Sequence, residues 1–231
     1  DFLDILPDVN ETITHYSGLS HSSTILDYTL LKGLARKFRE CSYLEIGTWF
    51  GESIVNVASV AKYCISISLS DEELQKQGAT KEEIFVQRLF SKNIPNIKHI
   101  KHNSKTFDFS SIGKFDLIFI DADHSYEGVK SDTRNAFKIL KDENSVIVWH
   151  DYSDLTGNAI NYGVLSGILD ACPKENLKNL GRAGDSFEDI ISRMYSLTKK
   201  HLLMAYLYDE SDSISIDEAR KILNKKWPKS G

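Results

Sequence analysis

Ionisable side chains follow two apolar runs of the sequence, and their types could bind a metal ion or move a proton. The run FDLIFIDADHSYEG presents Asp121, Asp123 and His124, and the run VIVWHDY ends on His150 and Asp151. A charge at the buried end of a strand is costly unless it is paired, hydrogen-bonded or metal-bound, so the two ends suggest one shared pocket. Asp121, His150 and Asp151 together offer two carboxylates and an imidazole, a donor set that suits Mg²⁺, Mn²⁺, Fe²⁺ or Zn²⁺.

The same residues could instead handle a proton. An imidazole titrates near neutral pH, which makes His124 a candidate general base for a substrate hydroxyl. A metal on Asp121 would lower the pKa of that hydroxyl and make a strong base unnecessary. Alternatively, Asp123 and His124 only cap the helix that begins at SYEG, and His150 and Asp151 only hold the strand end by hydrogen bonds.

A glycine-bearing turn, EIGTWFGES, forms a second candidate site. Glu45, Gly47 and Gly51 give the pattern E-x-G-x-x-x-G between a predicted strand and a predicted helix. Glycines there let the backbone approach a ligand, and the helix start offers free N–H groups, although a tight turn alone can also require glycine. The dinucleotide fingerprint G-x-G-x-x-G is not met, because Trp49 and Phe50 occupy its centre, and this argues against NAD or FAD.

This stretch resembles the first motif of class I S-adenosylmethionine-dependent methyltransferases, specifically the catechol and caffeoyl-CoA O-methyltransferase branch. The resemblance implies that the loop glycines cradle the methionine part of the cofactor. It also implies that Ser53 binds the cofactor carboxylate and that Glu45 is the acidic residue under the loop. The implied cofactor-binding residues of this motif are Glu45, Gly47, Thr48, Trp49, Gly51 and Ser53.

The next two strand ends fit the resemblance less closely. The family places an acidic residue for the ribose hydroxyls at the end of the second strand, where this chain has Ser68. Asp71 or Glu72 could reach the ribose, but we favour for both a role at the start of the helix DEEL, where acidic side chains are stabilised by the helix dipole. The third strand ends at KHNS, and the resemblance assigns Asn103 and Ser104 to the adenine, since an amide oxygen can accept from its exocyclic amine.

FIDADHSYEG and WHDY resemble a bacterial group of small-molecule and sugar O-methyltransferases with D-x-D-H-S-Y-E-G and H-D-Y motifs. Metal-dependent members of the branch carry Asp-Asn or Asp-Asp where this chain has His150 and Asp151. The resemblance implies that Asp121 also contacts the cofactor. The implied catalytic residues are Asp121, His124 and Asp151, and the implied metal ligands are Asp121, His150 and Asp151.

The activity that the resemblance implies is methyl transfer from S-adenosylmethionine to an oxygen of a small-molecule acceptor, of sugar or phenol type. It could proceed with or without Mg²⁺ or another divalent metal. Two alternatives stay open, namely a metal-dependent hydrolase or hydroxylase and a non-catalytic cofactor-binding module.

The elements that must position these residues follow from the apolar pattern. Residues 21–40 have helical spacing, with Ser22 or Ser23 as the expected N-cap, and residues 82–93 also predict a helix. Apolar strands alternate with helices along the chain, which predicts an α/β fold. We expect a Rossmann-like, doubly wound, mostly parallel sheet with helices on both faces and ligands at the carboxyl ends of its strands.

Length and composition limit the partners. With 231 residues we expect a single domain, made of an N-terminal helical cap region (1–40), a cofactor-binding core (41–155), and substrate-side helices with a late strand (156–231). The net charge of −5 argues against nucleic acid, and the absence of an apolar run of roughly 18 residues argues against a membrane span. Three cysteines without CxxC spacing suggest the cytoplasm. The chain begins with Asp1, so further residues could precede it, and a homo-oligomer is left open.

Overall fold

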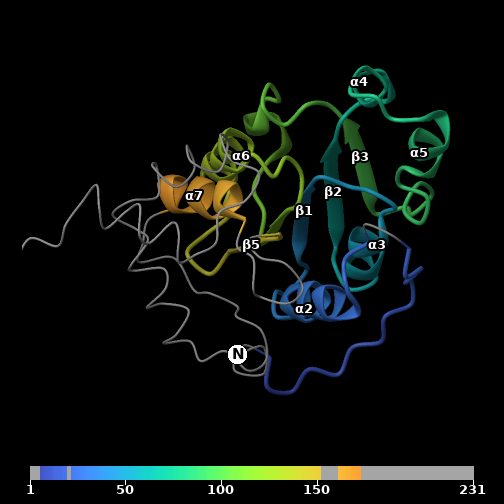
Figure 1. Cartoon of the computed structure of the whole chain (residues 1–231). Coiled ribbons are helices and arrows are strands. Elements are labelled where there is room, and N and C mark those ends of the chain that lie inside the picture. Colours follow the sequence, from blue (N-terminus) through green and yellow to red (C-terminus); the bar gives the residue numbers. More distant parts are fainter. Residues whose placement is uncertain (1–5, 20–21, 152–160, 173–231) are drawn as a thin grey trace, which may run out of the picture. The chain divides into compact units, whose positions relative to one another are not determined.

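The computed structural model describes residues 6–19, 22–151 and 161–172 (Figure 1). Contacts divide the chain into two compact units. The larger unit comprises residues 2–123 and 135–150, and the smaller one comprises residue 1, residues 124–134 and residues 151–231. The single-domain prediction stays a prediction, and the helices, loop and late strand expected beyond residue 172 lie outside the described residues.

A five-stranded parallel sheet forms the centre of the larger unit and confirms the predicted fold class (Figure 1). The order β3-β2-β1-β4-β5 reverses between β1 and β4, whose last residues Ile46 and Ile120 are paired. β1 and β4 are buried along their whole length, as expected for strands covered on both faces. The strands are β1 (Ser42–Ile46), β2 (Tyr63–Ser68), β3 (Ile97–Lys101), β4 (Leu117–Ile120) and β5 (Val146–Trp149).

Helices lie between most consecutive strands along the chain, and a 3₁₀ turn lies between β3 and β4. Within the larger unit, α2 packs against α3, and α3 contacts β2 and β3. The hydrophobic core gathers strand residues such as Leu44 and Ile118 with Ala136 near the end of α6. The described helices are α2 (Ile25–Arg36), α3 (Glu52–Ala58), α4 (Asp71–Lys76), α5 (Lys81–Val86), α6 (Tyr126–Lys138) and α7 (Tyr162–Ala171), with a 3₁₀ turn at Phe109–Ile112.

The predicted N-cap of α2 was wrong by one or two residues. Thr24 is the N-cap, and not Ser22 or Ser23. Its hydroxyl accepts from the Asp27 N–H (3.3 Å), and the Asp27 carboxylate accepts from the Thr24 N–H (2.7 Å). This reciprocal capping box satisfies two helix-end donors at once, and a serine at 22 or 23 lacks an acidic side chain three residues later.

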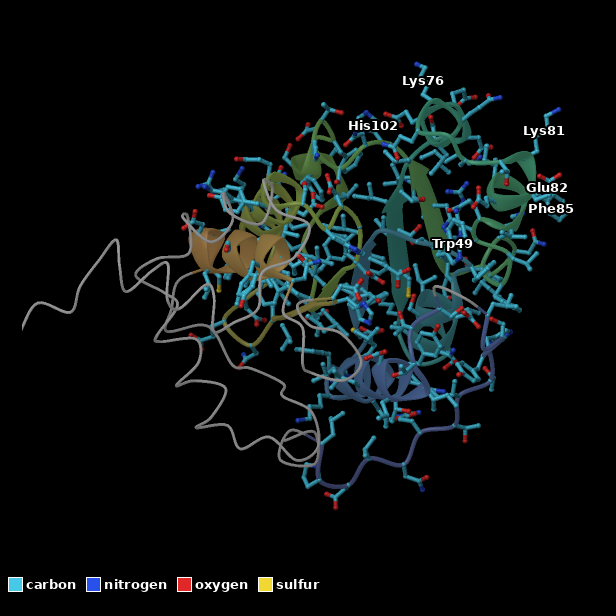
Figure 2. All side chains as sticks on the ribbon, viewed as in Figure 1. Trp49, Lys76, Lys81, Glu82, Phe85 and His102 are labelled. Atoms are coloured by element: carbon cyan, nitrogen blue, oxygen red, sulfur yellow. The ribbon has the colours of Figure 1, made fainter. Side chains whose placement is uncertain are left out.

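The helix predicted over residues 82–93 is shorter than expected. α5 ends at Val86, because Arg88 adopts a left-handed backbone (φ 60°) and its N–H donates to the Trp49 carbonyl at 2.6 Å. Phe90 N–H donates in the same way to the Phe50 carbonyl (3.0 Å). The chain thus exchanges helical bonds for bonds to the turn that follows β1. Phe85, on the last turn of α5, points outward (Figure 2).

Residues 11–17 run without regular secondary structure beside α2 and α3, and we call them the N-terminal strap. Arg36 donates to the Glu11 carboxylate (2.5 Å), and the Asn56 carboxamide bonds to the backbone of Thr14 and His15. The Ser17 N–H donates to Glu52, the first residue of α3. The strap is therefore held to α2 by the side chain of Glu11 and to α3 by bonds between its backbone and the side chains of Glu52 and Asn56.

Candidate functional site

The predicted glycine turn lies at the point where the strand order reverses. Gly47 has φ 94°, and a Cβ at this position would lie 1.9 Å from the Asp121 carbonyl oxygen. Gly51 has φ 81°, and a Cβ there would lie 2.2 Å from the Ser91 hydroxyl oxygen. Both glycines are thus required by backbone conformation and by neighbours within the protein. Their contact with a cofactor stays a prediction.

Glu45 lies fully buried at the end of β1, beneath this turn. Its two oxygens accept from the Thr48 hydroxyl (2.9 Å) and the Tyr43 hydroxyl (2.9 Å). Burial raises the pKa of the Glu45 carboxyl to about 7, although hydrogen bonds from Ser53, Tyr43 and Thr48 act in the opposite direction. Two residues predicted to contact the cofactor, Thr48 and Ser53, therefore bond to this carboxyl group.

Trp49, labelled in Figure 2, is half-buried in the same turn. Its ring packs against that of Phe50, with centroids 5.2 Å apart. The two aromatic side chains at the centre of the E-x-G-x-x-x-G motif therefore pack against each other. The Trp49 carbonyl accepts from Arg88, as described above. A side-chain contact between Trp49 and a cofactor stays a prediction.

At the end of β2, the Ser68 hydroxyl accepts from Nη1 of Arg88 at 2.8 Å. Asp71 lies in the first turn of α4, but the capping box is formed by Ser70 and Glu73. The Asp71 carboxylate instead accepts from Nη2 of Arg88 (3.1 Å) and from Lys101 (2.7 Å). Asp71 thus lies at the start of the helix, as we favoured from the sequence, and its carboxylate also binds the side chains of Arg88 and Lys101.

Beyond β3, Asn103 and Ser104 are both half-buried. The Asn103 side-chain oxygen accepts from the Lys105 N–H at 3.0 Å, which closes a local turn. A carbonyl oxygen has two lone pairs, so this bond leaves capacity for a second donor. The adenine contact predicted for the two residues stays a prediction.

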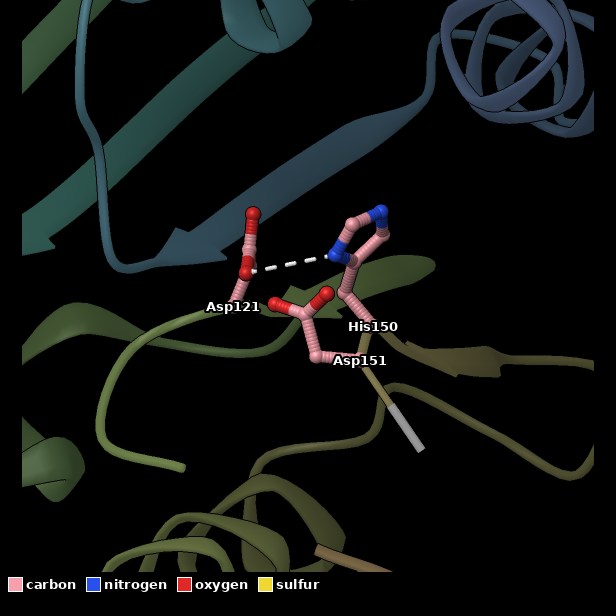
Figure 3. A group of neighbouring side chains, drawn as sticks. All are labelled: Asp121, His150 and Asp151. Atoms are coloured by element: carbon pink, nitrogen blue, oxygen red, sulfur yellow. Dashed lines mark ion pairs between the residues drawn. The ribbon is translucent and has the colours of Figure 1, made fainter. Parts of the chain in front are cut away.

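The ends of β4 and β5 bring Asp121 and His150 together in the larger unit (Figure 3). Nδ1 of His150 lies 3.6 Å from Oδ1 of Asp121, and Nε2 of His150 lies 3.5 Å from Oδ2 of Asp27. Burial opposes the ionisation of Asp27, but the hydrogen bond and charge of His150, with the Thr24 bonds, lower its pKa overall. The imidazole therefore lies between two carboxylates. Sequence reasoning missed Asp27, whose T-x-x-D spacing signals only a helix cap.

His124 and Asp151 form the corresponding pair in the smaller unit. Nε2 of His124 lies 3.1 Å from Oδ2 of Asp151, and both side chains are partly exposed. Asp151 has a left-handed backbone (φ 58°), which is uncommon for a residue with a side chain. At the start of α6 the Ser125 hydroxyl accepts from the Gly128 N–H (3.2 Å).

Asp123, the other acidic residue of the FIDADH run, forms an ion pair with Lys105 (2.5 Å) in the larger unit. The structure thus gives each ionisable residue after β4 a partner of its own. Each unit by itself contains one imidazole–carboxylate pair of the predicted site residues, Asp121 with His150 and His124 with Asp151.

The donors of the larger unit fit a divalent metal. Two ligand atoms that each lie about 2.1 Å from an ion such as Zn²⁺ are roughly 3–4 Å apart, and the Asp121–His150 separation of 3.6 Å falls in this range. A metal-binding imidazole also tends to have a carboxylate at its other nitrogen, as Asp27 provides here. Asp151 belongs to the other unit, and a metal site that includes it stays a prediction.

The parallel sheet reverses its strand order between β1 and β4, where the glycine turn lies, and this is the Rossmann-like arrangement predicted from the sequence. Residues 44–152 match the family model described as "Methyltransferase domain". This match confirms the resemblance to S-adenosylmethionine-dependent methyltransferases, while the O-methyltransferase branch and the residue roles stay predictions. It extends from within β1 through β5 and includes every predicted site residue.

A curated relative is the uncharacterized protein R132 of Acanthamoeba polyphaga mimivirus, which is 28% identical over 142 residues. The match covers 56% of this chain and 60% of the relative's length, so the chain spans less than two thirds of that protein.

Solved structures with a similar fold include N-methyltransferase NodS from Bradyrhizobium japonicum WM9 in complex with S-adenosyl-l-homocysteine (18% identity, TM-score 0.48, 70% of this chain and 80% of that one). Another is the S-adenosylhomocysteine-bound methyltransferase PaMTH1 from Podospora anserina (16% identity, TM-score 0.45, 83% and 72%). Among the described residues, no helix is long and apolar enough to cross a bilayer.

Proposed function

We propose that this protein transfers the methyl group of S-adenosylmethionine to an oxygen of a small-molecule acceptor, of sugar or phenol type. The methyltransferase-domain match over residues 44–152 supports the cofactor and the reaction class. The observation that favours an oxygen acceptor is the His124–Asp151 pair, with its 3.1 Å separation. A hydroxyl must lose its proton when it is methylated, and this pair supplies a base with a carboxylate that orients it.

In the proposed reaction the acceptor oxygen attacks the methyl carbon in line with the breaking bond. The new C–O bond forms as the S–CH₃ bond breaks, and its electron pair goes to sulfur, which leaves S-adenosylhomocysteine and a methyl ether. Asp151 accepts from Nε2–H of His124, so the neutral imidazole carries its lone pair on Nδ1. The hydroxyl proton goes to this nitrogen.

A metal-assisted form of the same reaction is favoured by Asp121 and His150. These two side chains, with Asp27 at the other nitrogen of His150, would hold a divalent cation. Such a cation would lower the pKa of an acceptor hydroxyl and reduce the need for a base. Asp121 and His150 would fix the position of the hydroxyl, and His124 would then be less important for the rate.

The test measures S-adenosylhomocysteine release by the full chain with a panel of phenols and sugars, in Mg²⁺ and in chelator. We expect turnover with at least one acceptor and a loss of roughly 10²–10⁴ in kcat for His124→Asn. The matched control is His15→Asn, which removes an imidazole from the N-terminal strap and should keep full activity. A rate that vanishes in chelator but survives His124→Asn would favour the metal-assisted reaction over proton transfer to His124.

Calorimetry with S-adenosylmethionine and S-adenosylhomocysteine separates this proposal from the two other functions. Cofactor binding without turnover on any acceptor would indicate a non-catalytic module. Tight metal binding with no affinity for either cofactor form would indicate a metal-dependent hydrolase or hydroxylase. Either result would overturn the proposed methyl transfer.

A further inference from the structure

Two helices, α6 and α7, pack with their backbones very close together within the smaller unit (Figure 1). A Cβ built on Gly167 of α7 would lie 2.8 Å from the Tyr126 carbonyl oxygen and 2.9 Å from Cβ of Val129. These distances are shorter than a side chain tolerates, so the close approach requires a glycine at this position. α7 therefore lies directly against the first turn of α6, which follows the candidate base His124 along the chain.

Gly163, near the start of α7, faces the backbone of His124 itself. A Cβ at this position would lie 3.2 Å from the His124 carbonyl oxygen and 3.4 Å from the Tyr126 nitrogen. A Cβ contact of 3.2 Å is tighter than most, so a methyl group added at Gly163 would press on the backbone that carries the His124 imidazole. α7 thus bounds residues 124–126 on one side, and we call these residues the His124 segment.

The side chain of Tyr126 ties the His124 segment to the other end of α7. Its hydroxyl donates to Oδ2 of Asp170 and accepts from Nζ of Lys130. Nζ of Lys130 also lies 3.2 Å from Oδ2 of Asp170, and the two side chains are only 18% and 12% exposed. Charge-assisted hydrogen bonds that are shielded from water are among the stronger ones. Gly163 and Asp170 lie near opposite ends of α7, roughly 10 Å apart along its axis, so α7 holds the segment at two points.

Tyr126 and Lys130 keep one protonation state around neutral pH. Burial raises the pKa of the Tyr126 hydroxyl, and the hydrogen bond with Tyr126 raises the pKa of the Lys130 ammonium. Tyr126 therefore stays a neutral hydroxyl and Lys130 stays charged. The bonds between them persist while His124 takes up a proton in the proposed reaction.

The contact between His124 and Asp151 does not by itself fix the imidazole. Nε2 and Oδ2 lie 3.1 Å apart, but the two side chains are 49% and 36% exposed. A pair that water reaches contributes little energy, because its charges are screened and both side chains lose conformational freedom. The direction of the imidazole therefore depends on how firmly the backbone of His124 is held.

We propose that α7 positions the base of the proposed reaction through Gly163, Tyr126 and Asp170. These positioning residues hold the backbone of His124, so that its imidazole stays bonded to Asp151 and Nδ1 faces the acceptor. The inference rests on the proposed function, in which His124 is the base. A reacting group that is misplaced by about 1 Å can lose roughly 10²-fold in rate, so the anchor matters for the reaction although it acts only through His124.

The first test follows the ring signals of His124 in nitrogen–proton spectra of the full chain. His124→Asn assigns these signals, and Asp151→Asn gives their position when the carboxylate partner is lost. Gly163→Ala and Tyr126→Phe should move the signals most of the way from the wild-type position towards that of Asp151→Asn. Both variants should fold, because alanine favours a helix more than glycine does and phenylalanine keeps the aromatic ring.

Each variant has a matched control in the larger unit. Gly33→Ala makes the same substitution in a helix, but its Cβ would meet only the side chains of Leu6 and Val9. Tyr63→Phe also removes a tyrosine hydroxyl, which donates to the Lys114 carbonyl at 3.3 Å. Both controls should leave the His124 signals at the wild-type position.

The second test measures rates with the phenol or sugar that the wild type methylates fastest. Gly163→Ala should lower kcat by roughly 10–10²-fold, while the affinity for S-adenosylhomocysteine in calorimetry stays within about 3-fold of the wild type. His124 signals that stay at the wild-type position in both variants would overturn the inference, and so would a loss of affinity that parallels the loss of rate. In either case wild-type turnover leaves the proposed function standing. A wild type that methylates no acceptor would overturn the proposed function and, with it, the role of His124 as the base, whereas the ring signals would still show whether α7 anchors the imidazole.

Discussion

Replacing Glu45 with glutamine should remove a specific pH dependence from the stability of the protein. Glu45 is fully buried at the end of β1, and burial raises its pKa from an ordinary value of 4.5 to about 7. The folded protein therefore holds the Glu45 proton more tightly than the unfolded chain does. Its contribution to stability is fully present below about pH 4.5 and is lost as the pH rises through about 7.

The size of the effect follows from the same two values. Each pH unit between them corresponds to about 1.36 kcal/mol, so the interval from 4.5 to about 7 corresponds to roughly 3 kcal/mol. This is a large share of the stability of an ordinary domain. Glutamine has a similar shape and does not titrate. Its side-chain oxygen can accept from one of the two hydroxyls, of Tyr43 or Thr48, and its amide N–H can donate to the other.

The assay is urea unfolding of wild type and Glu45→Gln at a series of pH values from about 4 to about 8. The difference in unfolding free energy between the two proteins should move in favour of the variant by roughly 3 kcal/mol over this range. Taking the difference removes the pH dependence that other carboxylates contribute equally to both proteins, such as Asp116, whose pKa is lowered. Glu82→Gln, at an exposed position on α5, controls for the loss of one charge (Figure 2). A difference that is constant with pH would refute the reasoning.

Three further perturbations have expected outcomes. Asp151→Asn should lower the rate of methyl transfer by slowing proton transfer to His124, while the affinity for S-adenosylhomocysteine stays the same. A loss of affinity in calorimetry that parallels the loss of rate would contradict the proposed role. Gly47→Ala should destabilise the fold by more than about 4 kcal/mol, because its Cβ would overlap the Asp121 carbonyl; a thermal midpoint near that of the wild type would contradict this. Asp116→Asn should lower the unfolding free energy by about 1–3 kcal/mol at neutral pH, because bonds from Ser42 and Lys141 outweigh the burial of Asp116 and lower its pKa. This loss should become smaller as the pH falls below about 3.8, which acid unfolding of both proteins measures.

The strand ends could be read from the sequence, because they depend on local pattern and on a general rule of parallel sheets. The apolar runs before Asp121 and His150 predict buried strands, and parallel strands deliver their carboxyl ends to one edge. The close approach of Asp121 and His150 follows from β4 and β5 being neighbours.

The partners of these residues could not be read, since they depend on contacts between distant segments. Asp27 reaches His150 from α2, and Arg88 reaches Ser68 from the segment after α5, without any sequence spacing that links them. The early end of α5 at Val86 has the same origin. The helical pattern of residues 82–93 continues, but the backbone of this segment donates hydrogen bonds to the glycine turn instead of forming further helical bonds. Long-range hydrogen bonds here override local propensity.

The N-terminal strap sets a boundary for any shortened version of this domain. Its last bond is made to Glu52, the residue that directly follows Gly51 and begins α3. Glu52 is buried and also accepts from the Tyr28 hydroxyl (3.2 Å). A chain trimmed to start at α2 would keep every described strand and helix of the larger unit, yet it would expose this carboxylate and remove the bonds of Asn56 to Thr14 and His15. The folded domain therefore begins before α2 and includes the strap, and the buried Leu6 packs against Gly33 of α2 as well.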